Sequence, residues 1–222
     1  MTTARELFHA ASTILLDFDG PVVGLLPPPL NSQLAETAKA AFRQSLGFLP
    51  PEFTDTTDHI AIIKAAGRSG SSAALAAVER TCTRAETDAA LVSTPTPGVS
   101  DLLDAARQHG KTVVIVSNNC PACISAFLAA QGLAEFVDGI VGRDPQHPEL
   151  MKPDPDLLDR ALALAGSPSP CTCCFIGDSL TDDEAAAARG ISFLGYAKSA
   201  RHALRFKDHG TEVTVHALTD ML

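Results

Sequence analysis

Two carboxylates stand one residue apart at the end of a short apolar segment. Residues 14–16 are aliphatic and run directly into Asp17, Phe18, Asp19 and Gly20. An apolar run this short is typical of a strand buried on both faces of a parallel sheet, and ligands of such sheets bind beyond the carboxyl ends of the strands. Two like charges there repel, so a divalent cation is a suitable partner. Taken alone, the segment could equally be a solvated turn.

Further residues that could do chemistry follow later segments of the chain. Each has an ordinary explanation: a turn, a surface lysine held extended by the next proline, or acidic residues in the first turn of a helix. Their order, spacing and expected placement at strand ends favour one shared site. They are Ser117 with Asn118 and Asn119, Lys152 before Pro153, and Asp178 with Asp182 and Asp183.

Alternating helices and strands are expected to position these residues. The alternation predicts an α/β fold, a doubly wound parallel sheet with right-handed crossovers that also contains the first apolar strand. The pattern predicts helices ending near Gly110 and over Ile124–Gln131, Pro155–Ala165 and Thr181–Arg189, and strands over Thr112–Ser117, Gly139–Val141, Cys173–Asp178 and Ile191–Leu194, with an edge strand at Glu212–Val215.

A helical segment interrupts this alternation after the first strand. Proline-rich stretches at 21–29 and 94–98 bracket it, and neither suits a helix or a central strand. Between them, apolar residues recur at helical spacing, and Thr57, with Asp58 next to it, marks an expected helix start. We therefore predict an α/β core domain of residues 1–20 and 98–222 and a helical cap domain of residues 21–97.

Composition bounds the class of protein. The formal net charge of -9 argues against a nucleic-acid partner. No apolar run is long enough to span a membrane, so no membrane partner is expected. Residues 1–13 are expected to lead straight into the first strand. They lack the pattern of a signal peptide, and this predicts a cytoplasmic protein. The expected assembly is a monomer or a homodimer.

The six cysteines allow more than one interpretation. Cys120 and Cys123, with Cys171, Cys173 and Cys174, could offer four sulfurs to zinc, and the first two could form a redox pair at a helix start. Cytoplasmic thiols stay reduced, and two of the five lie in an expected buried strand. Ordinary core cysteine is therefore the simplest interpretation, with zinc and redox roles as alternatives.

The four motifs in this order resemble those of the haloacid dehalogenase superfamily. The resemblance covers residues 12–20 and 95 to about 197 and is to the phosphatase branch with a helical C1-type cap, which includes phosphoglycolate phosphatases and β-phosphoglucomutases. It implies a Rossmann-like core and a magnesium-dependent phosphatase that acts on a small phosphorylated metabolite through an aspartyl-phosphate. Pro21 departs from the family pattern, where threonine is usual.

The resemblance also implies roles for the first two carboxylates. Asp17 would be the nucleophile that takes the phosphoryl group, and Asp19 the general acid that protonates the leaving alcohol and later activates water. Superfamily members that cleave carbon–halogen bonds lack an aspartate at the position of Asp19. The sequence therefore disfavours a dehalogenase.

The remaining roles concern phosphate and metal. Ser117, Asn118 and Lys152 would bind the phosphoryl oxygens, which cancels the repulsion between a carboxylate and a phosphate. Mg²⁺ prefers oxygen ligands. Its implied ligands are Asp17, the backbone carbonyl of Asp19 and Asp178, with Asp182 orienting metal-bound water or the lysine.

The substrate itself is not determined by these motifs. A sugar phosphate or a phosphoglycolate-like acid fits, and a phosphomutase would use the same residues. A non-catalytic phospho-ligand-binding or regulatory protein is the alternative of another class. In the predicted cap, Thr57, Asp58, His59, Lys64 and Arg68 could face the substrate, but a helix-capping or solvated position is the simpler expectation for each.

Overall fold

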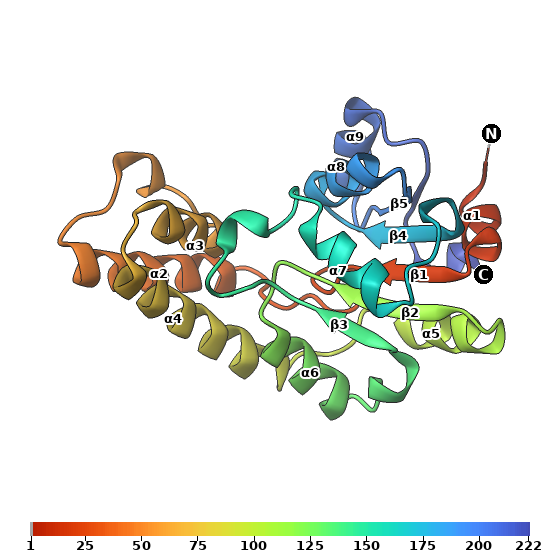
Figure 1. Ribbon diagram of the computed structural model, residues 1–222, viewed down its shortest axis with the longest axis horizontal. Helices are drawn as coiled ribbons and strands as arrows, with labels where there is room; N and C mark the ends of the chain where they lie inside the picture. The colour runs from red at the N-terminus through yellow and green to blue at the C-terminus, as the bar shows by residue number, and fades with distance from the viewer. Residues whose placement is uncertain (1) are drawn as a thin grey trace.

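The computed structural model describes residues 2–222, and its centre is one six-stranded parallel sheet in the order β3-β2-β1-β4-β5-β6. The first strand pairs with β2 on one side and β4 on the other, with Leu16 opposite Ile115 and Ile176. The carboxyl ends of these three strands therefore meet at one edge (Figure 1). The strands are β1 (Thr13–Leu16), β2 (Thr112–Val116), β3 (Gly139–Val141), β4 (Cys173–Gly177), β5 (Ser192–Tyr196) and β6 (Thr214–Val215).

Both faces of the sheet are buried under helices. Successive strand residues point to opposite faces, so Ile14 and Leu16 join one apolar cluster and Leu15 joins the other. The predicted doubly wound α/β fold is thus confirmed. The first cluster contains residues of α1 (Ala4–Ala10), α5 (Val99–Gln108) and α6 (Pro121–Ala130), and the second contains residues of α7 (Asp156–Leu164) and α8 (Leu180–Arg189).

Two helices of the core were not predicted. The expectation that residues 1–13 lead straight into the first strand is wrong, because α1 lies there and begins with a capping box between Thr3 and Glu6. Helix α9 (Ala200–His209) follows the N-cap Ser199 and packs Phe206 near Phe193 of β5. No helix of residues 2–222 is long and apolar enough to cross a membrane.

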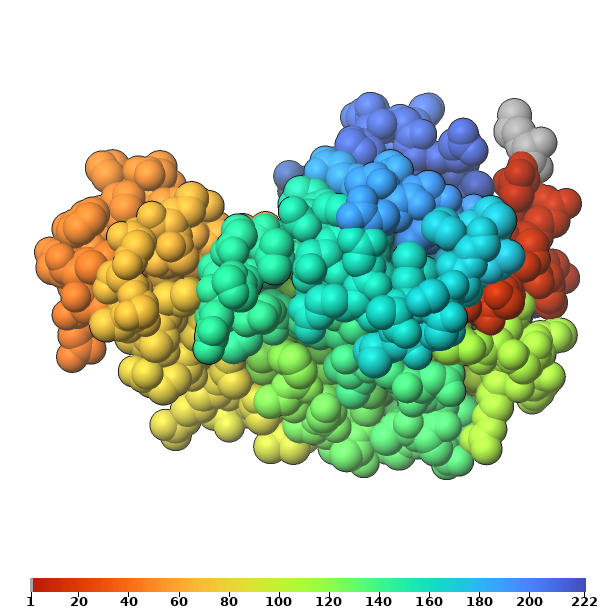
Figure 2. Space-filling view, viewed as in Figure 1, coloured from red at the N-terminus to blue at the C-terminus, as the bar shows by residue number. Residues whose placement is uncertain are grey.

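The inserted segment folds into a helical cap around an apolar cluster that Met151, from the core loop after β3, also joins. The helix start expected at Thr57 lies one residue further along, where the side chain of Asp58 accepts a hydrogen bond from the Ile60 amide. The cap lies beyond the carboxyl ends of the strands, and the surface is hollowed between cap and core (Figures 1 and 2). Its helices are α2 (Leu30–Leu46), α3 (His59–Arg68) and α4 (Ser72–Ala90).

The two chain segments that join cap and core are paired with each other. Val23 forms isolated bridges to Asp19 and to Pro95. The hydroxyl of Thr96, in the returning segment, donates a hydrogen bond of 2.7 Å to the Gly20 carbonyl. The outgoing and returning linkers are therefore held together directly beside Asp19.

Candidate active site

Lys152 joins two buried carboxylates at the centre of the sheet edge. Its Nζ lies 2.9 Å from Asp17 Oδ1 and 2.6 Å from Asp182 Oδ1. It also donates a hydrogen bond of 3.1 Å to the Val116 carbonyl. The structure thus brings together residues from the end of β1, from the loop after β3 and from α8.

Local structure fixes the position of Asp182. Its side chain accepts from the Ser179 amide, and its own amide donates to the Ser179 hydroxyl, which forms a capping box at the start of α8. A Cβ at Gly177 would lie 2.5 Å from Asp182 Oδ2. The glycine that ends β4 therefore lets the carboxylate reach Lys152.

Electrostatics at this edge favour a divalent cation. Burial raises the pKa of Asp17 to about 8 and the pKa of Asp178 to about 6, with Lys152 and Lys198 opposing the respective shifts. Carboxylate oxygens of Asp17, Asp178 and Asp182 lie within 4.8 Å of one another. Four carboxyl groups, Asp19 included, face two ammonium groups, so the lysines cannot compensate the negative charge when all four are ionised.

Asp178 occupies its position because residue 20 is glycine. Gly20 has φ of 131°, and a Cβ there would lie 2.4 Å from Asp178 Cγ. Lys198 Nζ lies 2.6 Å from Asp178 Oδ2. The buried oxygen donors and their uncompensated charge fit the hard, oxygen-preferring Mg²⁺ that the sequence predicts.

Asp19 has a different environment from Asp17. Burial raises its pKa, and a hydrogen bond of 3.0 Å from the Leu25 amide to Oδ1 opposes that rise. Leu25 belongs to the segment that leads into the cap. The side chain of Asp19 therefore lines the cavity and is bound by the linker that leads into the cap.

The segment after β2 lies against Lys152. Ser117 is buried and donates to Asn119 Oδ1 at 3.0 Å. The Asn118 side chain accepts from the Lys152 amide at 2.8 Å and donates to its carbonyl at 3.2 Å. Asn118 thus holds the backbone that carries the lysine, and α6 begins just beyond, at Pro121.

A cavity of about 530 Å³ separates this edge from the cap. Its cap side includes Thr57, Asp58, His59 and Lys64. The expectation of a capping or solvated position holds for Asp58 but is wrong for His59, which is only 7% exposed. Arg68 lies over the Phe53 ring.

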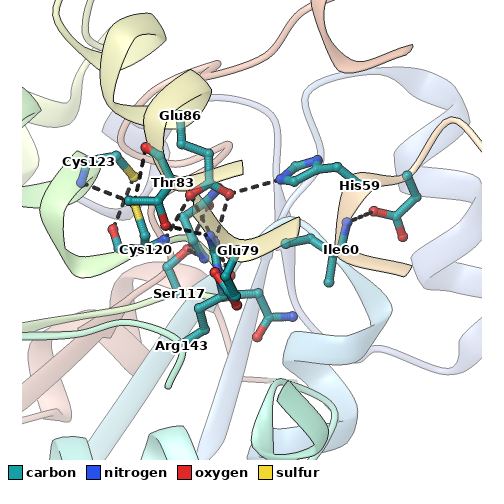
Figure 3. A network of polar contacts seen from close by, with 12 residues as sticks. His59, Ile60, Glu79, Thr83, Glu86, Ser117, Cys120, Cys123 and Arg143 are labelled. Atoms are coloured by element: carbon teal, nitrogen blue, oxygen red, sulfur yellow. Dashed lines mark hydrogen bonds and ion pairs between the residues drawn. The ribbon is translucent and has the colours of Figure 1, made fainter. Parts of the chain in front are cut away.

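Sequence reasoning missed the buried ion network beside the cavity. Arg143 donates to both Glu86 carboxylate oxygens at 2.8 Å and, through Nε, to Glu79 at 3.0 Å. Glu86 also accepts from His59 Nε2 at 2.9 Å and from the Asn119 amide group at 3.3 Å (Figure 3). Arg143 lies just after β3, so its place at a strand end could have identified it. It was not among the candidate residues.

The cysteines do not assemble into the four-sulfur site. Cys120 and Cys123 lie near Glu86, with their ligand atoms and its carboxylate within 4.8 Å, but the guanidinium of Arg143 is already paired there and opposes a cation. Cys173 begins β4 at the opposite edge of the sheet from Cys120. A zinc site made from both groups is therefore excluded by the topology.

Most of the core and the cap match one known protein family. The model of the haloacid dehalogenase-like hydrolase family matches residues 11–190, a stretch that spans β1 to α8 and includes the cap. The chain belongs to this family. It is therefore a haloacid dehalogenase-like hydrolase with a helical cap inserted after β1.

Two relatives of this hydrolase are named phosphoglycolate phosphatase. A phosphoglycolate phosphatase of Pseudomonas putida is 32% identical over 108 residues, which are 48% of this chain and 38% of that protein. The match thus spans less than half of that relative's length. A phosphoglycolate phosphatase of Cereibacter sphaeroides is 28% identical over 198 residues, 86% of this chain and 87% of that protein.

A solved structure shows the same fold. CbbY from Rhodobacter sphaeroides in complex with phosphate superposes with a TM-score of 0.66 at 19% identity, over 94% of this chain and 95% of that one. At this identity the likeness concerns the fold alone.

Proposed function

We propose that this hydrolase is a magnesium-dependent phosphatase that releases phosphate from a small phosphorylated metabolite through an aspartyl-phosphate. The observation that carries the proposal is the buried Asp17 at the end of the central strand, paired with Lys152 and followed two residues later by Asp19. The phosphoglycolate phosphatases among the relatives support a phosphorylated hydroxy acid as substrate.

In the first step a free carboxylate oxygen of Asp17 attacks phosphorus, and the ester P–O bond breaks. Asp19 gives its proton to the departing alkoxide, for which the raised pKa of its buried carboxyl group is suited. Lys152 balances the charge of Asp17 and of the phosphoryl oxygens. Ser117, whose side chain lines the cavity, donates to these oxygens.

In the second step water hydrolyses the aspartyl-phosphate. Asp19, now ionised, takes a proton from the water as it attacks phosphorus, and the bond to Asp17 breaks. Free phosphate leaves, and both carboxyl groups return to their starting states. The hydrogen bond from the Leu25 amide stabilises the ionised form of Asp19 between the steps.

Magnesium would be held by Asp17, Asp178 and the backbone carbonyl of Asp19. When bound, it supplies positive charge that draws phosphate to a carboxylate-rich site and stabilises the charge of the transition state. Lys198 contributes positive charge on the outer side of Asp178. Asp182 keeps Lys152 protonated and in place.

Phosphate release from a panel of phosphorylated hydroxy acids and sugar phosphates tests the function. We expect release in the presence of Mg²⁺, near-complete loss in chelator, and full recovery when Mg²⁺ is restored. Stoichiometric free phosphate distinguishes hydrolysis from the mutase alternative, which returns the phosphoryl group to a second hydroxyl. Release that is unaffected by chelator would contradict the proposal.

Asp19→Asn is expected to slow good and poor leaving groups unequally. For an alkyl phosphate we expect kcat/KM to fall about 10²-fold or more, because the alkoxide needs a proton as it departs. For p-nitrophenyl phosphate the fall should be much smaller, since nitrophenolate leaves without one. The ratio of the two kcat/KM values is the measurement, and equal losses would contradict an acid role for Asp19.

A further inference from the structure

His59 is a buried cap residue whose ring has one nitrogen fixed and one free. It opens α3 and lines the same cavity as Asp19 and Ser117. Nε2 lies 2.9 Å from Glu86 Oε1. The pKa of Glu86 is lowered to about 2, because Arg143 and the hydrogen bond from His59 outweigh the effect of burial. Glu86 is therefore ionised, and Nε2 of His59 is the donor. Nδ1 has no hydrogen-bond partner among residues 2–222.

Glu86 is itself immobilised, which fixes the His59 ring. Both of its oxygens accept from Arg143 at 2.8 Å, and Oε2 also accepts from the Cys120 amide at 3.0 Å. The side chains of Glu86 and Arg143 are at most 1% exposed. Figure 3 shows His59 on one side of Glu86 and Cys120 and Cys123 on the other. The ring is therefore held in one orientation from the core, across the boundary with the cap.

The cap groups around the ring favour an anion. Residues 57–61 line the cavity, so the positive end of the α3 dipole and its first-turn amides face it. Lys64 also lines the cavity, where its Nζ donates to the Met151 and Lys152 carbonyls at 3.3 and 3.0 Å. The opposing charge is Asp58, an exposed side chain whose oxygen is used to cap the helix.

We propose that His59 is the cap residue that binds a second anionic group of the substrate, a carboxylate, through Nδ1. The inference rests on the proposed phosphatase function and narrows its substrate to a phosphomonoester with a carboxylate close to the ester oxygen. The ring then lies between the Glu86 carboxylate and the substrate carboxylate, with Nε2 toward the first and Nδ1 toward the second. Glu86, fixed by Arg143, is the positioning residue.

Two substrates that differ in one group test this role. Phosphoglycolate and ethyl phosphate share the phosphate and the two-carbon chain, but only the first carries a carboxylate. We expect the parent to favour phosphoglycolate in kcat/KM. His59→Gln keeps a donor toward Glu86 and places a carbonyl oxygen toward the cavity. For this variant we expect kcat/KM for phosphoglycolate to fall about 10- to 100-fold, mainly through KM, and that for ethyl phosphate to change less than about threefold.

The ratio of the two kcat/KM values separates recognition from a structural effect. A folding defect lowers both values and leaves the ratio unchanged, which would overturn the inference, as would a variant with the parent's ratio. Glu86→Gln is expected to shift the ratio in the same direction as His59→Gln. The control Arg84→Gln, 87% exposed on the same cap, should leave the ratio unchanged.

Failure of this inference is distinct from failure of the phosphatase function. A parent that hydrolyses phosphate esters but shows no preference for the carboxylate-bearing member of a pair overturns the role of His59 alone. A parent that releases phosphate from no ester of the panel in Mg²⁺ overturns both.

Discussion

Asp17→Asn is expected to reduce phosphate release by about 10⁴-fold or more for every substrate of the panel. The amide oxygen is a poor nucleophile and cannot form the aspartyl-phosphate, so neither step can proceed. Rapid quenching with labelled substrate should trap phosphorylated protein in the parent and none in the variant. A variant that retains a tenth of the parent's kcat would contradict the covalent role of Asp17.

The same substitution should leave the fold intact in chelator. Burial raises the pKa of Asp17 to about 8, so its contribution to stability becomes increasingly unfavourable as the pH rises from the unfolded pKa of 3.8 toward 8. At pH 7 the folded protein holds a proton that the unfolded chain has released, and a neutral asparagine avoids this penalty, so the melting temperature should be unchanged or higher. Asp104→Asn, the same change at an exposed position of α5, is the control and should preserve both activity and melting temperature.

Glu86→Gln is expected to lower the free energy of unfolding by about 3–5 kcal/mol at pH 7. The substitution leaves Arg143 with less countercharge in a buried site, and the new amide nitrogen faces the Arg143 and Cys120 donors. Denaturant unfolding monitored by circular dichroism measures the loss. The control Glu135→Gln removes an exposed pair with Arg107, 2.9 Å apart, and should cost less than about 1 kcal/mol.

The pH dependence of this loss has a definite sign. The folded pKa of Glu86, about 2, lies below its ordinary value of 4.5, so its contribution to stability is present above pH 4.5 and is lost as the pH falls toward 2. The difference in stability between the parent and Glu86→Gln should therefore be largest above pH 5 and shrink on acidification. A difference that is constant down to pH 2 would contradict a paired, ionised Glu86.

The parallel core could be predicted because its pattern is local. Short apolar runs such as 112–116 and 173–177 alternate with helical repeats, and each buried strand ends where its polar residue begins. Placement of Asp17, Ser117 and Asp178 at one sheet edge then follows from parallel topology. The sequence could not show that Asn118 turns its side chain to the Lys152 backbone, because that contact depends on the loop between β3 and α7.

The ion network could not be predicted in the same way. Arg143 and its partner Glu86 lie 57 positions apart in the chain, in a core loop and a cap helix, and no local pattern relates them. A glutamate within a helix is ordinarily solvated. Only the packing of α4 against α6 shows that this one is buried. Helix α1 was missed because seven residues are too few for a clear period.

The paired linkers limit how caps can be exchanged between members of this family. The Leu25 amide that binds Asp19 lies on the outgoing linker, and Thr96 of the returning linker binds the Gly20 carbonyl. A chimaera joined immediately after Gly20 would take its donor to Asp19 from the foreign cap. Crossover points that preserve the hydrogen bond to Asp19 therefore lie beyond Leu25 on the outgoing linker and before Pro95 on the returning linker. Residues 20–25 and 95–96 are then inherited with the core.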